Sequence, residues 1–536
     1  MLELAERTGQ TAPAEIRPTP APTVLWALGV AVVVPAAIPV GYLLWVVFRP
    51  GGFNAGGFTG ARLAELAANT ALLTVAVTAA TVVIGVTTAW LTTRTDLGGS
   101  RIWSTVMTLP LVIPSYVGAL AMLSASGNGG TITLVLERLG LPGLPVFQGF
   151  WAAWAALSLW NFSFIHLLAV PVLRRLDPAL EDVARGLGAS RWRVIRTVII
   201  PQLRPALASG GLLVALYVLA EFGAVSMLRF DTFTRTIYTQ FAGRIDPGPA
   251  LFLAGVLSAG ALVLVALQQW SRGKASLHTN RPARRVVAQV LSKGQRVAAH
   301  GFLGLLAALA LVLPLSTLVW WLIRGLEEGS SLLGVVPHSL RSVGISAVTA
   351  VVVGAAAVPL AVLATRHRSR ATRTLEAIPW LTYSLPHIAV GLAFLVLTVR
   401  YVRPIYQTTL LLVVAYLAMF LPQALAAVES GLRRVGPGLE EVSRSLGVGQ
   451  WATMRRVTIP IMRRSALAGA ALVFLSVMKE LPATLLLRPT GFDTLPVRVW
   501  SATNEVFYSQ ASFAALALVA LSAVPLYLFV VRDIHD

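Results

Sequence analysis

Residues 181–204, EDVARGLGASRWRVIRTVIIPQLR, return later in the chain as residues 440–463, EEVSRSLGVGQWATMRRVTIPIMR. Eleven of the 24 positions are identical, and the two stretches stay 259 residues apart throughout. Unrelated segments of this length do not share so many residues in one register. Self-similarity at a fixed separation is the mark of an internal repeat. We therefore expect the chain to contain two copies of one structural unit.

The repeat extends well beyond this stretch. Downstream, equivalent residues keep the separation of 259, whereas upstream they are 272 residues apart. The first copy therefore carries 13 extra residues between Pro114 and Glu181. The matched positions are Thr93-Arg94 with Thr365-Arg366, Pro114 with Pro386, Glu221 with Glu480, and Arg229 with Arg488.

The composition limits the class of protein. Of the 536 residues, 56% are hydrophobic and 12% are charged, and the mean hydropathy is +0.74. Soluble proteins carry about 25% charged residues, so soluble globular, disordered, collagenous and disulfide-scaffold classes are excluded. The absence of cysteine also excludes thiolate catalysis, iron–sulfur clusters and cysteine-ligated zinc. The class that remains is a polytopic membrane protein.

Twelve apolar windows are long enough to cross a bilayer, for which a helix needs about 20 residues. Each copy holds six windows, and because six is even the two copies have the same orientation in the membrane. The predicted fold class is an all-α polytopic membrane protein of two parallel six-helix repeats. We expect prolines 110, 114, 379 and 386 to kink the third crossing of each copy. The windows are Val24–Phe48, Ala67–Leu91, Ile102–Ser124, Pro145–Val172, Val198–Phe222 and Pro249–Trp270, then Phe302–Ile323, Leu340–Thr365, Leu375–Val399, Ile405–Glu429, Val457–Leu481 and Ala511–Val531.

The charge pattern orients the chain. The formal net charge is +20, and a cytoplasmic N-terminus places most of the 43 Lys and Arg residues in cytoplasmic segments. This positive-inside pattern predicts a bacterial plasma (inner) membrane protein with both termini in the cytoplasm. The basic clusters lack the interleaved aromatic residues that stack on bases, so no nucleic-acid partner is expected. The predicted organisation is a disordered cytoplasmic tail (1–23), a first repeat (24–270), a basic cytoplasmic linker (271–301) and a second repeat (302–536).

Each repeated motif predicts a short amphipathic helix in a cytoplasmic loop. In the first copy Pro178 can start the helix and Gly188 can end it, the usual positions for these residues. Such a helix could lie among lipid headgroups. Two near-copies in equivalent loops instead favour a docking site for two identical partner subunits. The face at helical spacing comprises Leu180, Val183, Ala184 and Leu187, and the second copy repeats the plan with Pro437, Leu439, Val442, Ser443, Leu446 and Gly447.

The motif resembles the EAA loop of binding-protein-dependent ABC importer permeases, in which E-x-x-x-x-x-x-G is followed by V-x-I-P. Two six-crossing copies in one chain resemble the fused permeases of the ferric-iron group. Residues 221–224 with 228–233, and residues 479–484 with 487–494, resemble stretches of those iron permeases. The first copy reads Glu-Asp-Val instead of Glu-Ala-Ala, and the second has a serine at 443 where alanine is usual.

This resemblance implies a fold like that of type I ABC importer permeases and a transporter subunit without enzymatic activity. The implied partners are two copies of a cytoplasmic ABC ATPase, an extracytoplasmic binding protein and membrane lipid, with no need for a second permease chain. No cofactor is expected on this chain, since G-x-x-x-x-G-K-[ST] is absent, and ATP–Mg would bind the partner ATPase. The implied ATPase-coupling residues are Glu181, Val183, Ala184, Leu187, Gly188, Pro201, Glu440, Val442, Ser443, Leu446, Gly447 and Pro460.

Two acidic residues are candidates for the substrate pathway. Glu221 and Glu480 occupy equivalent places near the outer end of the fifth crossing, and ionisable groups within spans are often functional. Paired carboxylates could attract Fe³⁺, which prefers oxygen ligands. Alternatively, each glutamate pairs with Lys479, Arg229 or Arg488, or caps a re-entrant turn. The residues specify no metal site.

The predicted function is therefore the permease subunit of an ATP-driven importer, with ferric iron as the cargo that the resemblance implies. Thiamine, sulfate or molybdate, polyamine and phosphonate importers have similar loops, so these cargoes remain alternatives. A secondary carrier would show charged relays in mid-helix, and an intramembrane enzyme would show a dense His/Asp/Glu cluster. The seven histidines are scattered along the chain, which disfavours an intramembrane enzyme.

Overall fold

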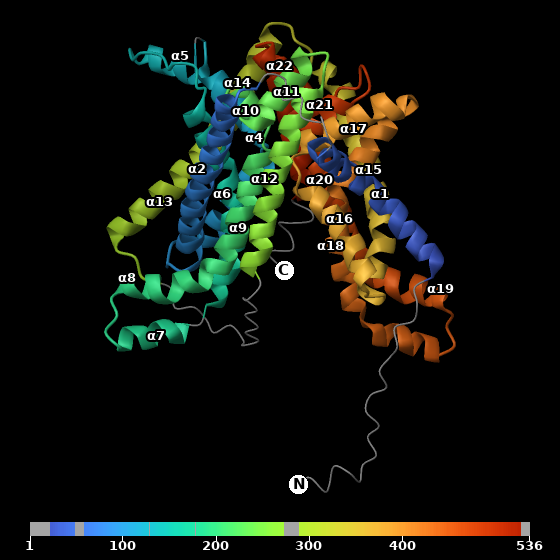
Figure 1. Cartoon of the computed structure of the whole chain (residues 1–536). Coiled ribbons are helices and arrows are strands. Elements are labelled where there is room, and N and C mark those ends of the chain that lie inside the picture. The colour runs from blue at the N-terminus through green and yellow to red at the C-terminus, as the bar shows by residue number, and fades with distance from the viewer. Residues whose placement is uncertain (1–21, 49–57, 128, 177, 273–288, 527–536) are drawn as a thin grey trace.

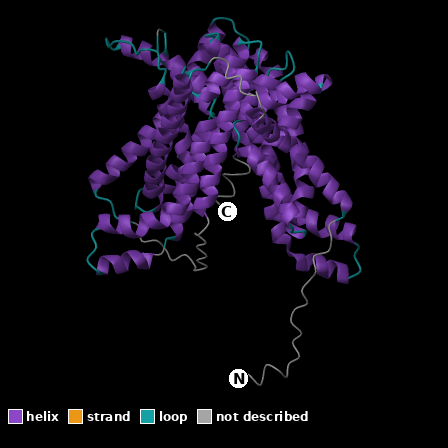
Figure 2. Cartoon of the chain, in the orientation of Figure 1, coloured by secondary structure: helices purple, strands orange, loops and turns teal. Residues whose placement is uncertain are grey.

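The computed structural model describes residues 22–48, 58–127, 129–176, 178–272 and 289–526. Within these residues the fold is helical, and the one pairing of extended backbone is an isolated bridge between Thr95 and Gln289 (Figure 2). The expected all-α class is confirmed.

The first repeat and its helices end before the undescribed residues 273–288. Its elements are α1 (Thr23–Phe48), α2 (Gly60–Thr93), α3 (Ser100–Val106), η1 (Leu109–Val112), α4 (Ser115–Ala125), α5 (Thr131–Arg138), α6 (Phe150–Arg175), α7 (Pro178–Gly186), α8 (Arg191–Val194), η2 (Ile195–Ile199), α9 (Ile200–Ala220), α10 (Gly223–Met227), α11 (Phe233–Gly243) and α12 (Gly248–Arg272).

The second repeat has an equivalent succession of helices. Its elements are α13 (Lys293–Ala307), η3 (Ala308–Val312), α14 (Leu313–Glu327), η4 (Leu332–Val335), α15 (Val336–Arg366), α16 (Arg370–Ser384), α17 (His387–Tyr401), η5 (Arg403–Ile405), α18 (Thr409–Ser445), α19 (Gln450–Thr453), η6 (Met454–Thr458), α20 (Ile459–Met478), α21 (Pro482–Leu487), α22 (Leu495–Asn504) and α23 (Tyr508–Leu526).

Among the described residues, ten helical segments are long and apolar enough to cross a membrane, or twelve when each of two bent pairs is one span. The bent pairs are Ser100–Val112 with Ser115–Ala125, at 88°, and Arg370–Ser384 with His387–Tyr401, at 105°. The breaks fall at Pro114 and Pro386, where proline interrupts the backbone hydrogen bonds. The predicted kinks are therefore confirmed at Pro114 and Pro386, whereas Pro110 lies within η1 and Pro379 within α16.

Each bent pair takes the chain from one end of the molecule to the other. In Figure 1, α7, α8 and α19 lie at the lower end, and α5, α11 and α22 lie at the upper end. The loop that precedes α3 lies beside α7, because Arg94 contacts Glu181, and α4 leads to α5. This path supports the count of twelve crossings.

The first span of each repeat packs on the other repeat. Helix α1 contacts α15, α16 and α18, while α13 to α14 run along the first repeat. The Trp160 indole of α6 donates to the Ala310 carbonyl of η3 at 3.1 Å, and the Trp103 indole of α3 donates to His300 of α13 at 3.0 Å. The two repeats are therefore tied together by exchanged helices as well as by their central contact.

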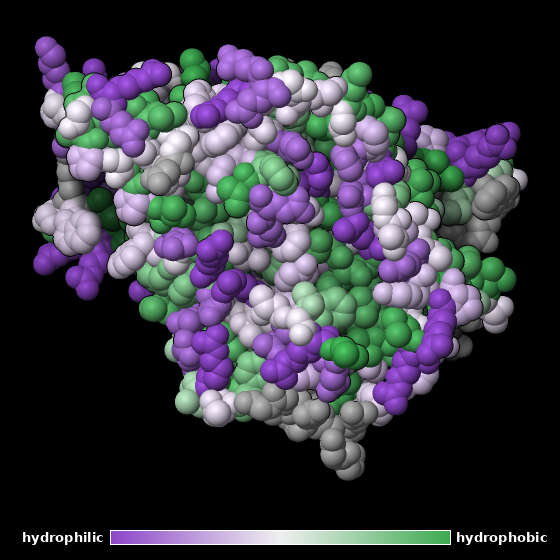
Figure 3. All heavy atoms as spheres, turned by 90° about the horizontal axis from the view of Figure 1, so that it is seen from above, coloured by the Kyte–Doolittle hydropathy of each residue, from purple (hydrophilic) through white to green (hydrophobic). Residues whose placement is uncertain are grey.

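The centre of the molecule is where the repeats meet. Tyr116 and Phe222 belong to the same buried apolar cluster as Leu481. A Cβ at Gly223 would lie 2.8 Å from the Cβ of Tyr116 and 3.2 Å from a methyl carbon of Leu481, so only glycine allows this close approach. Seen from above, the upper face carries hydrophilic residues among hydrophobic ones (Figure 3).

Candidate functional site

Helix α7 presents an apolar row to the outside at the lower end of the molecule. Leu180, Val183 and Leu187 are 50%, 60% and 83% exposed, although they follow the helical spacing that normally marks a buried face. Helix α7 ends at Gly186, and Gly188 lies two residues beyond it with φ +81°, a backbone conformation that favours glycine. The site is thus an exposed row of apolar side chains, called the ridge below, on a helix that ends at a glycine-dependent turn.

The second copy builds the same ridge on the last turns of α18. Leu439, Val442 and Leu446 are exposed to a similar degree, and Gly447 repeats the φ of +81°. One expectation needs correction, because no new helix begins at Pro437. Helix α18 continues from Thr409 to Ser445, since a proline within a helix removes one hydrogen bond and need not end the helix.

The two motif glutamates point inward, away from the exposed ridges. Glu181 is buried and forms an ion pair with Arg94, which directly follows α2. Glu440 pairs with Arg366, at the end of α15, at 3.0 Å, and also accepts from the Thr458 hydroxyl at 3.1 Å. Glu181 and Glu440 therefore do not belong to the outer apolar surface of the ridges. The carboxylates bind their own repeat, and apolar side chains form the outer surface.

Arg94 and Arg366 are site residues that the motif by itself did not reveal. The available signal was the duplication of Thr93-Arg94 as Thr365-Arg366. A buried carboxylate is strongly disfavoured unless a cation compensates it, so a repeated arginine is a natural partner for a repeated glutamate. Burial lowers the pKa of the Arg94 guanidinium from its usual value, and arginine remains a cation at neutral pH.

The remaining motif residues hold the helices in place. Ala184 packs against the buried cluster that contains Val194. At the equivalent positions the Ser443 and Thr453 hydroxyls lie 2.9 Å apart and are both buried. The apolar pair of Ala184 and Val194 in the first repeat is thus replaced in the second by the hydrogen-bonded pair of Ser443 and Thr453. This bond accounts for serine at position 443.

Pro201 and Pro460 lie in the first turn of α9 and α20. Each follows a π-helical segment, η2 or η6. Because the first-turn N–H of a helix needs no intrahelical partner, proline is tolerated there. The two prolines therefore mark where the motif joins the next span.

Glu221 and Glu480 each cap a short helix at the centre of the molecule. The Glu221 carboxylate accepts from the Ala224 N–H at 2.9 Å and from the Ser115 hydroxyl at 2.8 Å. The Glu480 carboxylate accepts from the Ala483 N–H at 3.0 Å and lies 2.7 Å from His387 Nδ1. Such contacts fix the helix starts at α10 and α21.

Two of the three cations considered as partners of these glutamates, Lys479 and Arg488, have other contacts. The Lys479 ammonium donates to the Leu111 carbonyl of the first repeat at 2.9 Å, and Arg488 pairs with Asp493. Within the described residues, no ion pair joins Glu221 or Glu480 to an arginine or lysine. The same residues contain no group of three or more His, Asp or Glu side chains that could hold a metal ion.

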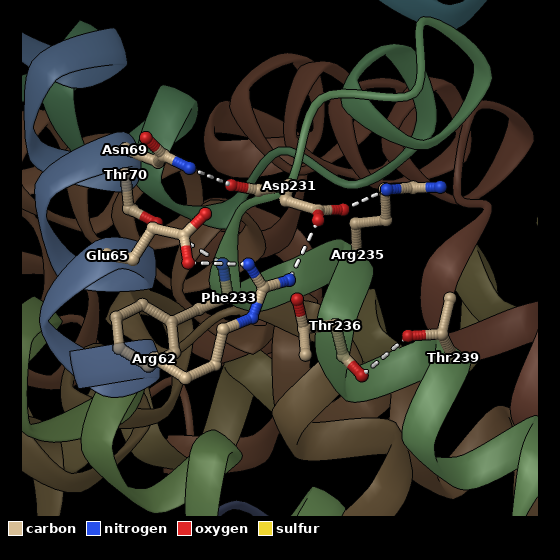
Figure 4. A network of polar contacts seen from close by, with 9 residues as sticks. All are labelled: Arg62, Glu65, Asn69, Thr70, Asp231, Phe233, Arg235, Thr236 and Thr239. Carbon is tan, nitrogen blue, oxygen red and sulfur yellow. Dashed lines mark hydrogen bonds and ion pairs between the residues drawn. The ribbon is translucent and has the colours of Figure 1, made fainter. Parts of the chain in front are cut away.

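A polar network anchors the turn between α10 and α11 to the upper end of α2 (Figure 4). Arg62 pairs with Asp231 at 2.8 Å, and the Asn69 side chain donates to the Asp231 carbonyl at 3.1 Å. The Phe233 N–H donates to the Thr70 hydroxyl at 3.2 Å. Helix α2 therefore connects this upper turn to Arg94, the partner of α7, at its lower end.

Comparison with known proteins places the chain among transport proteins. The sequence profile described as "Binding-protein-dependent transport system inner membrane component" matches residues 81–276 and again residues 357–532. The chain is 33% identical over 471 residues to the "Fe(3+)-transport system permease protein FbpB 2" of Haemophilus influenzae, covering 87% of this chain and 90% of that protein.

Other relatives are named for other cargoes. The chain is 30% identical over 188 residues to the "Sulfate transport system permease protein CysT" of Escherichia coli, covering 34% of this chain and 67% of that protein. It is 28% identical over 148 residues to the "Putative 2-aminoethylphosphonate transport system permease protein PhnV" of Salmonella typhimurium, covering 28% of this chain and 56% of that protein.

Proposed function

The chain belongs to the family of binding-protein-dependent transport system inner membrane components, and from this premise we propose that it is the fused permease of an importer driven by two copies of one ATPase. It is a multi-pass inner membrane protein and a permease subunit, not an enzyme. The family works with a separate ATPase and a substrate-binding protein. The copy number and the residues that contact the ATPase are our proposal.

The observation that carries this proposal is the pair of exposed apolar ridges. Each ridge places three large apolar side chains outward while its glutamate faces inward. Contiguous exposed apolar surface outside the bilayer marks a protein interaction site, and apolar anchors supply most of the binding energy at interfaces. Because equivalent ridges come from both repeats, two identical ATPase subunits fit one chain, and no second permease is needed.

The two Arg–Glu ion pairs connect each ridge to a membrane-spanning helix. A displacement of α7 is transmitted to α2 through the ion pair between Glu181 and Arg94. A displacement of the end of α18 is transmitted to α15 through the ion pair between Glu440 and Arg366. Helix α2 carries the upper network at its other end. Closure of the ATPase pair would therefore move both ends of these helices together, with ATP–Mg bound on the ATPase and no cofactor on this chain.

The ridges must face the cytoplasm, where the ATPase binds. The described start of α1 and end of α12 lie toward the same lower end (Figure 1), which supports cytoplasmic positions for both the N-terminal segment and the linker. The predicted cytoplasmic C-terminus falls on residues 527–536, which lie outside the described residues.

We propose ferric iron as the cargo because a relative matched over 87% of this chain and 90% of its own length is an Fe(3+) permease. Glu221 and Glu480 border the proposed pathway where the repeats meet. Their contacts with Ala224 and Ala483 support a positioning role, in which each carboxylate fixes the helix start beside the path. Sulfate and phosphonate are the alternative cargoes that other relatives suggest.

The test is reconstitution of the full chain in lipid vesicles with its ATPase and its binding protein. We expect two ATPase subunits per chain and ATP-dependent uptake of radioactive Fe³⁺ that requires the binding protein. Uptake of sulfate or 2-aminoethylphosphonate without Fe³⁺ would replace the cargo and leave the permease assignment intact. Uptake driven by a proton gradient without ATP would contradict the mechanism.

A further inference from the structure

A groove of about 540 Å³ lies on the second repeat, away from the ridges and the central contact. It is formed by α15, the start of α18 and the loop that follows α21. The lining is apolar except for one arginine and one threonine. The lining residues are Arg341, Gly344, Ile345, Val348, Val352, Thr409, Leu410, Val413 and Phe492.

The groove has the length of half a bilayer. Arg341 and Val352 are eleven residues apart on α15, which is about 16 Å at ~1.5 Å per residue. Arg366, beside the lower ridge, is about 38 Å from Arg341 along the same helix. Because the hydrocarbon core is about 30 Å thick, Arg341 lies at the headgroup level of the leaflet opposite the ridges. The apolar part then extends to the middle of the membrane.

Arg341 has no carboxylate partner among the described residues. Its guanidinium lies 5.9 Å from the centre of the Phe492 ring. The nearby Asp493 is paired with Arg488 instead. A guanidinium at headgroup level with free donor capacity is suited to phosphate, which it can bind through two hydrogen bonds.

The first repeat has larger side chains at the positions equivalent to Gly344 and Val413 of the groove. The positions that match Arg341, Gly344 and Val413 carry Asn69, Leu72 and Trp154. The Trp154 indole donates to the Ala76 carbonyl at 3.2 Å. Trp154 also stacks edge-on with Trp151 at 5.9 Å, and Phe150 meets Phe230 at 5.6 Å. In the first repeat the Trp154 side chain thus occupies space that Val413 leaves open in the second repeat.

We propose that the groove of the second repeat binds one phospholipid of that leaflet. One acyl chain lies along α15 between Gly344 and Val352, and the phosphate contacts Arg341. A Cβ at Gly344 would meet no heavy atom within 4 Å, so this glycine leaves room for the acyl chain. The site does not depend on the cargo or on the ATPase ridges.

The test is a titration of the delipidated, full-length chain with dioleoyl phosphatidylglycerol, followed by native mass spectrometry. Dioleoylglycerol, which lacks the phosphate, is titrated in parallel. We expect one tight phosphatidylglycerol site in the wild type. Arg341→Gln should weaken phosphatidylglycerol binding about tenfold, as for the loss of a charged hydrogen bond, and leave dioleoylglycerol binding unchanged.

The double variant Gly344→Leu with Val413→Trp copies the first repeat and should lose the site for both lipids. Leucine favours helix more than glycine does, so α15 should not be weakened. Val351→Trp, on a 70% exposed position of α15 outside the groove, is the control and should bind as the wild type does.

Equal phosphatidylglycerol binding by the wild type and the double variant would overturn the proposal. Equal binding of both lipids to the wild type would overturn the role of Arg341. Should the double variant fail to fold, as judged by size-exclusion chromatography, the Arg341→Gln titration decides between these outcomes without it.

Discussion

The two repeats have equivalent helices, but the Arg–Glu ion pair that connects the ridge to a membrane-spanning helix is buried more deeply in the first repeat than in the second. In the first repeat α7 is separate from α6, and the Arg94 and Glu181 side chains are only 3% and 10% exposed. In the second, α18 is continuous, and the Arg366 and Glu440 side chains are 16% and 23% exposed. Both repeats thus contain the Arg–Glu ion pair, but the exposed fraction of its side chains differs between them. Equivalent substitutions should therefore have unequal effects.

The largest expected effect on transport comes from blocking both ridges. Gly188→Trp with Gly447→Trp places a bulky residue where nothing lies within 4 Å but where φ is +81°, so the turn is strained locally. We expect the membrane-spanning helices to stay folded and docking of the ATPase to be blocked. The loss of an interface anchor costs about 2 kcal/mol or more, which is about thirtyfold in ATPase affinity. Copurification of the ATPase and ATP-driven uptake should both fall. Unchanged association in the double variant would refute docking at the ridges.

The second expected effect compares the two ion pairs. Arg94→Ala leaves the buried Glu181 carboxylate with only the longer contact to the exposed Arg185 guanidinium at 3.6 Å, so it should cost about 3 kcal/mol, the lower end of the range for a buried charge that loses its partner. Arg366→Ala should cost about 1 kcal/mol, because Glu440 is partly exposed and keeps the Thr458 hydroxyl. Thermal unfolding of the purified chain measures the difference.

The matched control for this pair is Arg94→Met with Glu181→Gln, which removes both charges together. It should recover most of the stability that Arg94→Ala loses, since no unpaired charge stays buried. Equal destabilisation by Arg94→Ala and Arg366→Ala would show that the difference in burial has no energetic consequence.

A smaller effect separates two roles of the central carboxylates. Glutamine at 221 or 480 loses the charge but keeps an oxygen that can accept the Ala224 or Ala483 N–H. We expect Fe³⁺ uptake by Glu221→Gln and Glu480→Gln to stay within about threefold of the wild type, whereas alanine loses about 1 kcal/mol of capping energy. Loss of uptake in the glutamine variants at normal membrane abundance would instead make the carboxylates cargo ligands.

The smallest expected effect concerns a contact that the first repeat alone has. The Leu291 N–H, together with Arg296, holds the pKa of Asp96 below its usual value, and the equivalent position in the second repeat is Arg368. A lowered pKa means that the contact persists at neutral pH and is lost only as pH falls below about 4. The hydrogen-exchange protection factors of Gln289 and Leu291, which correct for the slower intrinsic exchange at lower pH, should be unchanged from pH 7 to pH 5.

Asp96→Asn is the matched variant for that contact, because it removes the charge at every pH. It should speed exchange at Leu291 at pH 7 and leave exchange near Arg368 unchanged. A fall in the protection factor of Leu291 in the wild type between pH 7 and pH 5 would contradict the assigned direction of the pKa shift.

Much of the fold could be predicted because its signals are local. The apolar windows predicted the membrane-spanning helices, and Pro114 and Pro386 predicted the kinks. The repeated motif predicted the two amphipathic segments that form the ridges. The exchange of α1 and α13 between repeats could not be predicted, since hydropathy shows that a helix crosses the membrane but not which helix it contacts. The inward direction of Glu181 was also missed, because its partner lies 87 residues earlier in the chain.

The sequence by itself determined that the chain is a membrane protein, that its unit occurs twice, and which loops carry the shared motif. Hydrophobicity, proline and repetition act through neighbouring residues, so they can be read without a fold. Only the tertiary structure decided which charges pair, which apolar rows stay exposed, and why one repeat has a groove where the other has Trp154. Those outcomes depend on contacts between residues far apart in the chain, where packing and the cost of burying an unpaired charge select the arrangement.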